Sequence, residues 1–186
     1  MPYVLAAAAL APEAAPPPGV DPEAYARALW QDTYDALDDL TGVTAYVAAP
    51  ADPDLGTWLP AADATAALKA LHDDQGATIG AVVAGDAPDL PGLLVGKLFG
   101  ACEDTLAGVL PASDGRLVGL ATRLPLPDWL DGVTLDKSLD WLHERAPVKA
   151  VQVGPGWHRL REPTDVARLD PRLDGWYATR ALLSGY

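Results

Sequence analysis

A continuous apolar run in the middle of the chain sets the strongest limit on its fold. Residues Ile79–Ala84 read Ile-Gly-Ala-Val-Val-Ala, with no alternation between apolar and polar side chains. A strand of this kind is buried on both faces, as in a parallel sheet covered by helices. The run stops at Gly85-Asp86, and Pro88 and Pro91 prevent a longer strand or an unbroken helix. The sequence therefore predicts a central parallel strand that ends just before Asp86.

The position of Asp86 has two interpretations. A carboxylate at the carboxyl end of a central parallel strand lies where open α/β sheets hold their ligands. In that case Asp86 faces a nucleotide phosphate or a metal, and we expect its side chain to be partly exposed in a pocket. In the other interpretation, Asp86 or Asp89 only caps a turn and the helix that begins near Gly92. The local pattern alone favours capping.

Predicted strands and helices alternate along most of the chain. The strands are 3–10, 43–49, 79–84, 106–110, 116–122 and 148–153. The helices are 21–40, a short one after Asp63, 92–102, 135–145, 164–169 and 176–183, while 50–60 and 125–132 are connectors. This order predicts one α/β domain over residues 1–186, a three-layer sandwich with a mostly parallel sheet and a pair of strands inserted late.

The predicted helix 21–40 has the clearest boundaries. Asp21-Pro22-Glu23 supplies an N-cap acid, a proline at the first helical position and an acid that the helix dipole favours. An inward stripe follows at the expected spacing: Ala26, Leu29, Thr33, Leu37 and Leu40. The acids Asp32, Asp35, Asp38 and Asp39 are expected mainly on its solvated side.

The charge balance excludes two classes of function. With 26 acids, 13 bases and a formal net charge of −13, the chain lacks the basic face needed to bind nucleic acid or acidic membranes without sequence specificity. No apolar run is long enough to span a membrane. The apolar segment 4–11 has no basic n-region, so it is expected to be a buried strand rather than a signal peptide. We expect a cytoplasmic protein whose single cysteine, Cys102, is buried near a helix end.

Familiar catalytic motifs are missing. The chain has no phosphate loop of the Gly-x-x-x-x-Gly-Lys type and no Gly-x-Gly-x-x-Gly after the first strand. Its three histidines lack metal-ligand spacing, and no serine lies in a nucleophile elbow. A set of polar residues remains at predicted strand ends: Asp86, Asp89, Asp114, His158, Arg159 and Arg161. Their spacing alone does not bring them together.

Three segments, taken in order, resemble one family. They are Gly-Asp-Ala-Pro-Asp-Leu-Pro at 85–91, Pro-Ala-Ser-Asp-Gly at 111–115 followed by Leu-Val-Gly-Leu at 117–120, and Trp157 followed by Pro-Thr-Asp at 163–165. The family is the bacterial glycosyltransferase-A-like group of rSAM/selenodomain-associated or arsenosugar-biosynthesis glycosyltransferases. Its fold is similar to that of the molybdenum-cofactor and phospholactate nucleotidyltransferases. The likeness, which includes the helix 21–40, spans about residues 15–169.

The resemblance implies a site and a ligand. Asp86 would lie near the diphosphate of a nucleotide-sugar and its divalent metal, Mg or Mn, while Asp114 and Gly115 would belong to the acceptor-side turn. On this basis the candidate catalytic residues are Asp86 and Asp114. The candidate substrate-binding residues are Asp89, Gly115, His158, Arg159 and Arg161.

Two departures from the family weigh against ordinary metal-dependent transfer. Members of the family follow the first strand with a glycine and a cluster of lysines and arginines, whereas residues 11–18 here contain no base. Near the end, Arg159-Leu160-Arg161 replaces an Asp-Val-Asp pattern. Guanidinium groups cannot bind a cation, but their forks match phosphate oxygens.

Three hypotheses follow. The first is a divergent glycosyltransferase or nucleotidyltransferase that acts on a nucleotide-activated donor without a metal, with Arg159 and Arg161 on one face of an extended segment as a joint clamp. The second, of equal weight, is a catalytically degenerate pseudoenzyme that serves as a binding or partner module. In the third, the two arginines only pair with surface acids, at little energetic worth.

Overall fold

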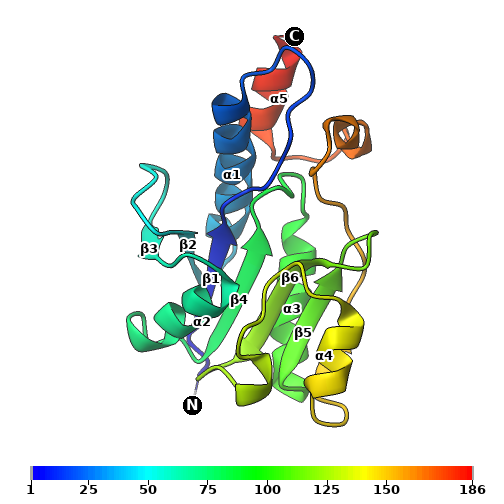
Figure 1. The fold of residues 1–186 in the computed structure, drawn as a ribbon. Coiled ribbons are helices and arrows are strands. Elements are labelled where there is room, and N and C mark those ends of the chain that lie inside the picture. The colour runs from blue at the N-terminus through cyan, green and yellow to red at the C-terminus, as the bar shows by residue number, and fades with distance from the viewer. Residues whose placement is uncertain (1, 186) are drawn as a thin grey trace.

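The computed structural model describes residues 2–185, and its strands form one mixed seven-stranded sheet (Figure 1). The strands are β1 (Leu5–Leu10), β2 (Val43–Ala49), β3 (Trp58–Pro60), β4 (Ile79–Ala84), β5 (Ala107–Pro111), β6 (Leu117–Arg123) and β7 (Val151–Val153). Their order is β3-β2-β1-β4-β6-β5-β7, and β6 alone runs antiparallel to its neighbours. The predicted fold class, an α/β sandwich with a mostly parallel sheet and a late strand pair, is confirmed.

Helices cover both faces of this sheet. They are α1 (Pro22–Asp38), α2 (Ala64–Asp73), α3 (Gly92–Asp104), α4 (Leu139–Arg145) and α5 (Tyr177–Ser184), with short 3-10 helices η1 (Asp128–Leu130) and η2 (Pro163–Arg168). One core cluster contains residues of α1 and α3, and the other contains residues of α2 and α4. A third cluster joins α5 to α1, which Figure 1 shows side by side. None of the helices in residues 2–185 is long and apolar enough to span a membrane.

The alanine-rich β1 shows why small side chains suit the centre of this sheet. Ala7 lies opposite Ala45 of β2 and Ala81 of β4 in the strand register. Ala6 and Ala8 belong to the core cluster under α2, whereas Ala7 and Ala9 belong to the cluster under α1 and α3. Successive side chains of a strand point to opposite faces, so β1 is buried on both sides. The expectation of a buried first strand is confirmed.

Several predicted boundaries of helices and strands were wrong. The helix predicted over 135–145 begins only at Leu139, because the Ser138 hydroxyl caps it by accepting the Trp141 N–H at 3.2 Å. The strand predicted over 148–153 begins at Val151, since Lys149 has a left-handed φ of 62° and Val148 is 93% exposed. The connector 50–60 holds a short edge strand, β3, which the sequence did not predict.

One acid of α1 was assigned to the wrong environment. Asp32 was expected on the solvated side, but it is buried and accepts the backbone N–H groups of Ala178 at 2.9 Å and Thr179 at 2.7 Å. These are donors in the first turn of α5, which have no partner within their own helix. Burial raises the pKa of Asp32 from its ordinary value. Asp32 therefore links α1 to α5.

Two glycines in α3 lower the stability of the helix, although packing does not require glycine at either position. A Cβ added to Gly96 or Gly100 meets no atom within 4 Å, and both positions are exposed. Alanine is favoured over glycine inside a helix, so Gly96→Ala and Gly100→Ala should each raise the free energy of unfolding by about 0.5–1 kcal/mol in urea denaturation. Gly108→Ala is the contrasting control, because its Cβ would lie 2.7 Å from the Ala101 Cβ and should destabilise the protein. Unchanged or lower stability in both α3 variants would contradict this account.

Candidate active site

Asp86 lies where the sequence predicted, but in a different environment. It follows β4, the middle strand of the sheet, and the arrowheads of β1 and β4 point to the same edge (Figure 1). The expectation of a partly exposed side chain was wrong, because Asp86 is 0% exposed. Its carbonyl accepts the Leu160 N–H at 2.8 Å, so the segment after β7 covers it.

The side chain of Asp86 forms a buried, two-point ion pair with Arg159. The Arg159 Nε donates to Oδ1 at 2.7 Å, and the Nη2 donates to Oδ2 at 2.9 Å. Arg159 is only 8% exposed, and its Nη1 also donates to the Leu117 carbonyl at 3.3 Å. The backbone N–H of Glu13, in the loop after β1, is 3.4 Å from Oδ2. The hydrogen bonds between a guanidinium and a carboxylate in this geometry are strong, and each group fixes the orientation of the other.

Asp89 holds the same covering segment at a second point. The Trp157 Nε1 donates to Oδ1 at 3.2 Å, and the His158 Nε2 lies 2.9 Å from Oδ1 and 3.0 Å from Oδ2. The Trp157 and His158 rings are stacked, with centroids 4.9 Å apart. The first turn of α3 has Pro91 at its N-cap, which makes no side-chain hydrogen bond to it. Asp86 and Asp89 therefore hold the segment 157–160, and the predicted capping of α3 is not seen in residues 2–185.

Asp136 is the acid on which the arginines converge. Its Oδ1 accepts from the Arg161 Nη1 at 2.7 Å and from the Arg116 Nη1 at 3.4 Å, and lies 3.9 Å from the Arg159 Nη1. The hydrogen bond from Arg161, followed by the charges of Arg161, Arg159 and Arg116, lowers the pKa of this carboxyl from its ordinary value. Arg161 also donates to Glu13 Oε2 at 3.1 Å. The two arginines thus share one face, as their spacing predicted.

Sequence reasoning did not select Asp136. It was assigned to a predicted helix over 135–145, where an acid in the first turn needs no further explanation. The signal that was available is Ser138, a strong N-cap residue, which would have moved the helix start and left Asp136 in the preceding loop.

Two cavities meet at Arg159, at this edge of the sheet. The strand-end cavity, about 230 Å³, is lined by Leu10, Ala11, Pro12, Glu13, Ala48, Ala62, Asp63, Ala64, Ala84, Thr134, Leu135, Asp136 and Arg159. The arginine cavity, about 280 Å³, is lined by Ala112, Ser113, Asp114, Arg116, Arg159, Arg161, Glu162, Asp165 and Arg168. Since Arg159 lines both, this residue lies between them.

Asp114 lies in the arginine cavity, on the turn between β5 and β6. Its side chain is 48% exposed, and its Oδ1 accepts the Arg116 N–H at 3.0 Å. Gly115 has the predicted left-handed conformation, with a φ of 83°. Among the candidate catalytic residues, Asp114 is therefore the carboxylate that a ligand in a cavity can reach.

The carboxylates at this edge do not fit a divalent metal. Mg²⁺ and Mn²⁺ prefer oxygen ligands, above all carboxylates. Here Arg159 holds both oxygens of Asp86, and Arg161 pairs with both Asp136 and Glu13. In residues 2–185 no group of three or more His, Cys, Asp or Glu side chains is arranged to hold a metal ion.

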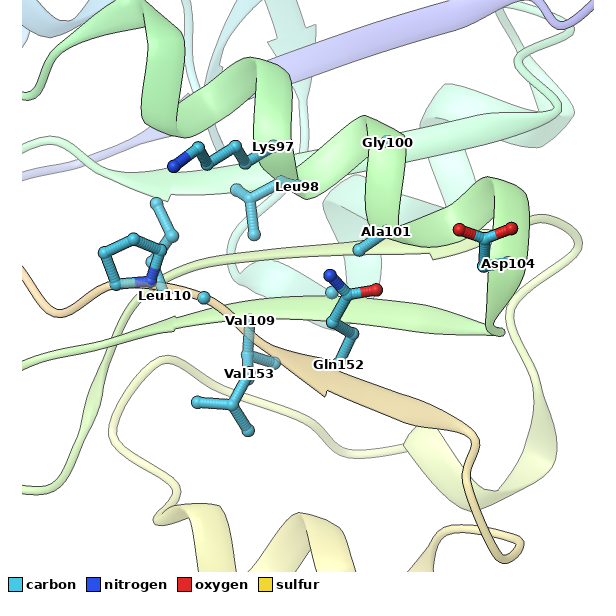
Figure 2. Close-up of a pocket in the computed structure, with 12 residues that line it drawn as sticks. Lys97, Leu98, Gly100, Ala101, Asp104, Val109, Leu110, Gln152 and Val153 are labelled. Atoms are coloured by element: carbon cyan, nitrogen blue, oxygen red, sulfur yellow. The ribbon is translucent and has the colours of Figure 1, made fainter.

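A larger cavity lies elsewhere, between α3 and the strands β5 and β7 (Figure 2). Its volume is about 630 Å³, and Figure 2 shows Lys97 and Asp104 near its opposite ends with Gln152 between them. The rest of its lining is apolar or glycine, and it contains no predicted site residue. We place the candidate site at the carboxyl edge of β4 because charged groups from distant segments converge there.

Comparison with known proteins supports the fold. No family model matches the chain, and no curated protein matches it in sequence. A solved structure from Desulfovibrio desulfuricans G20, described as a nucleotide-diphospho-sugar transferase, aligns with a TM-score of 0.66 and 19% identity over 99% of this chain and 98% of that chain. The 2-C-methyl-D-erythritol 4-phosphate cytidylyltransferase of Thermus thermophilus aligns with a TM-score of 0.54 and 18% identity over 90% of this chain and 100% of that one.

A third solved structure was determined with ligands. The glucosyl-3-phosphoglycerate synthase of Mycobacterium tuberculosis, in complex with Mg²⁺ and uridine diphosphate, aligns with a TM-score of 0.57 and 12% identity over 98% of this chain and 79% of that one. Identities this low establish the fold alone. The chain therefore has the fold that these nucleotide-diphospho-sugar transferases and nucleotidyltransferases share.

Proposed function

We propose that the chain binds a nucleotide-activated donor at the carboxyl edge of β4 without a divalent metal and transfers a group from it. The observation that carries this proposal is the buried Asp86–Arg159 pair. In the family that the sequence resembles, the acid at the position of Asp86 lies near a metal. Here a fixed guanidinium balances the charge of that acid and occupies both of its oxygens, so the acid is not free to hold a metal.

The lining of the cavities suggests where the two parts of the donor, its nucleoside and its diphosphate, would bind. The strand-end cavity has a wall of small apolar side chains, including Ala11, Ala48 and Ala84, and would take the nucleoside. Its Arg159 wall faces the diphosphate. Arg161 pairs with Glu13 and Asp136, whose side chains are 62% and 48% exposed. The Arg161 side chain is itself 22% exposed, and the two acids can turn to solvent when a diphosphate takes its donors.

Transfer would follow from these positions. The hydroxyl oxygen of an acceptor in the arginine cavity attacks the sugar carbon bonded to the diphosphate, and the new carbon–oxygen bond replaces the old one. Asp114 accepts the hydroxyl proton. The electron pair of the broken bond passes to the diphosphate, whose growing charge is stabilised by Arg159 and Arg161.

Nucleotide binding is therefore expected to survive EDTA. Calorimetric titration with UDP, CTP and UDP-sugars should give the same Kd in EDTA and in Mg²⁺ or Mn²⁺. Arg161→Ala should weaken that binding by about 10- to 100-fold, the worth of charge-assisted hydrogen bonds from one guanidinium. Arg172→Ala is the control, because Arg172 is 89% exposed and, among residues 2–185, its ion pair is with Asp170. No affinity at millimolar concentration, with or without metal, would reject the proposal.

One observation favours a second candidate, a binding module without turnover. The acids nearest the strand ends are held by other side chains: Asp86 by Arg159, Asp89 by Trp157 and His158, and Asp136 by Arg161. This leaves Asp114 to act as a base. Tight nucleotide binding without loss of the donor over long incubation with candidate acceptors would select this alternative.

A further inference from the structure

The arginine cavity reverses the charge balance of the rest of the chain. The sequence has 26 acids and 13 bases, whereas this cavity is lined by four arginines and three acids. One of these acids is already used, because Asp165 Oδ2 accepts the N–H groups of Arg161 at 3.0 Å and Glu162 at 2.8 Å. Arg159 is held by Asp86, and Arg161 by Asp136 and Glu13, so Arg116 and Arg168 are the arginines of this lining that favour an anionic ligand.

Arg168 and Ser113 both line this cavity. The Arg168 Nη1 donates to the Ser113 Oγ at 2.9 Å, which leaves the hydroxyl proton of Ser113 for another acceptor. The Arg168 side chain is 51% exposed, and its only ion pair in the described part of the chain is a 3.6 Å contact between Nε and Asp165. Arg116, with a 44% exposed side chain, lines the same cavity. Together these groups present donors that a phosphate can use.

The volume limits what this cavity holds. At about 280 Å³ it lies just below the range of roughly 300–1,000 Å³ that is usual for small-molecule pockets. A small phosphorylated compound fits such a volume, and Asp114 lines the same space, where it can meet a hydroxyl of that compound.

We propose that the arginine cavity is the acceptor site and that the acceptor is a small phosphomonoester, bound through its phosphate by Arg168, Ser113 and Arg116. The role of this compound as an acceptor rests on the proposed function, whereas the phosphate site rests on its own contacts. The phosphate would lie against Arg168 and Ser113, and the reacting hydroxyl toward Asp114. The donor diphosphate would lie against Arg159, on the side of the strand-end cavity.

Glycerol 3-phosphate and glycerol are the matched probes, titrated into the full chain in a calorimeter at low salt. Glycerol 3-phosphate should bind and glycerol should not. Arg168→Ala should weaken the binding of glycerol 3-phosphate by about tenfold or more, and Ser113→Ala by less, since an ionised donor contributes more than a hydroxyl. Arg172→Ala is the control of equal charge change. Absence of glycerol 3-phosphate binding, or equal effects of Arg168→Ala and Arg172→Ala, would overturn the proposal.

Competition with UDP separates this inference from the proposed function. If both ligands bind together, and Arg168→Ala leaves UDP affinity unchanged, the two sites are distinct and the inference is supported. If UDP displaces glycerol 3-phosphate, the cavity holds the donor diphosphate and the acceptor site is rejected, while nucleotide binding stands. If glycerol 3-phosphate binds with the expected response to Arg168→Ala but no nucleotide binds, the phosphate site stands and the proposed function fails.

Discussion

Replacing Arg159 by methionine is expected to lower the free energy of unfolding by about 3–5 kcal/mol. The variant removes both guanidinium donors to Asp86, which is 0% exposed and would be left as a buried charge without a counter-ion, held by the 3.4 Å hydrogen bond from the Glu13 N–H. Methionine keeps most of the side-chain volume, so the loss reports the charge rather than a cavity. Urea denaturation, followed by circular dichroism at constant pH, measures it.

An exposed pair of similar length is the matched control. The Lys69 Nζ lies 2.8 Å from Asp131 Oδ1, but the two side chains are 51% and 64% exposed. Lys69→Met should therefore cost much less than Arg159→Met, because solvent screens the exposed pair. A similarly small loss for Arg159→Met would mean that Asp86 reaches water and that the pair is only a surface contact.

The same burial reverses an expectation from the sequence. An exposed Asp86 would tolerate Asp86→Asn with little change in stability. Because Asp86 is buried and paired, Asp86→Asn should instead cost more than about 2 kcal/mol. The double variant Asp86→Asn with Arg159→Met should recover part of the loss, since no charge then remains buried without a partner. If the loss of stability in the double variant equals the sum of the two single losses, the groups do not interact.

The architecture was predictable because its signals are local. The run Ile79–Ala84 and the prolines that follow it fix the end of the central strand, and Asp21-Pro22 fixes the start of α1. Such features act through backbone geometry and burial within a few residues. Predicted boundaries were wrong where two local signals competed. At Ser138, an N-cap residue lies inside a periodic apolar pattern, and α4 begins after the N-cap rather than at the start of the pattern.

The pairing within the site was not predictable because it joins distant segments. Asp86 and Arg159 are 73 residues apart, and the Arg161–Glu13 contact spans 148 residues. Spacing placed the two arginines on one face, but the partner of each depends on how the segment after β7 crosses the end of β4. Only the fold decides that Arg159 faces a buried acid while Arg161 faces acids that are half-exposed.

The removal of one accessible carboxylate should separate catalysis from binding. Asp114→Asn is expected to lower kcat by roughly 10²- to 10⁴-fold, the usual contribution of a general base. The Kd of the nucleotide donor should stay within about twofold, because the proposed donor cavity lies on the other side of Arg159 and Asp114 does not line it. The turn should persist, since the amide oxygen of asparagine can still accept the Arg116 N–H that Asp114 Oδ1 accepts at 3.0 Å.

Asp140→Asn is the control for this variant, because Asp140 is an exposed acid in the first turn of α4 and lines neither cavity. Both variants remove one negative charge, so a general electrostatic effect would change their rates equally. Equal rates for Asp114→Asn and the unmodified chain would remove Asp114 from the reaction. If the unmodified chain binds the donor but no candidate acceptor produces turnover, Asp114 has no proton to accept, and the chain acts as a binding module built on a transferase fold.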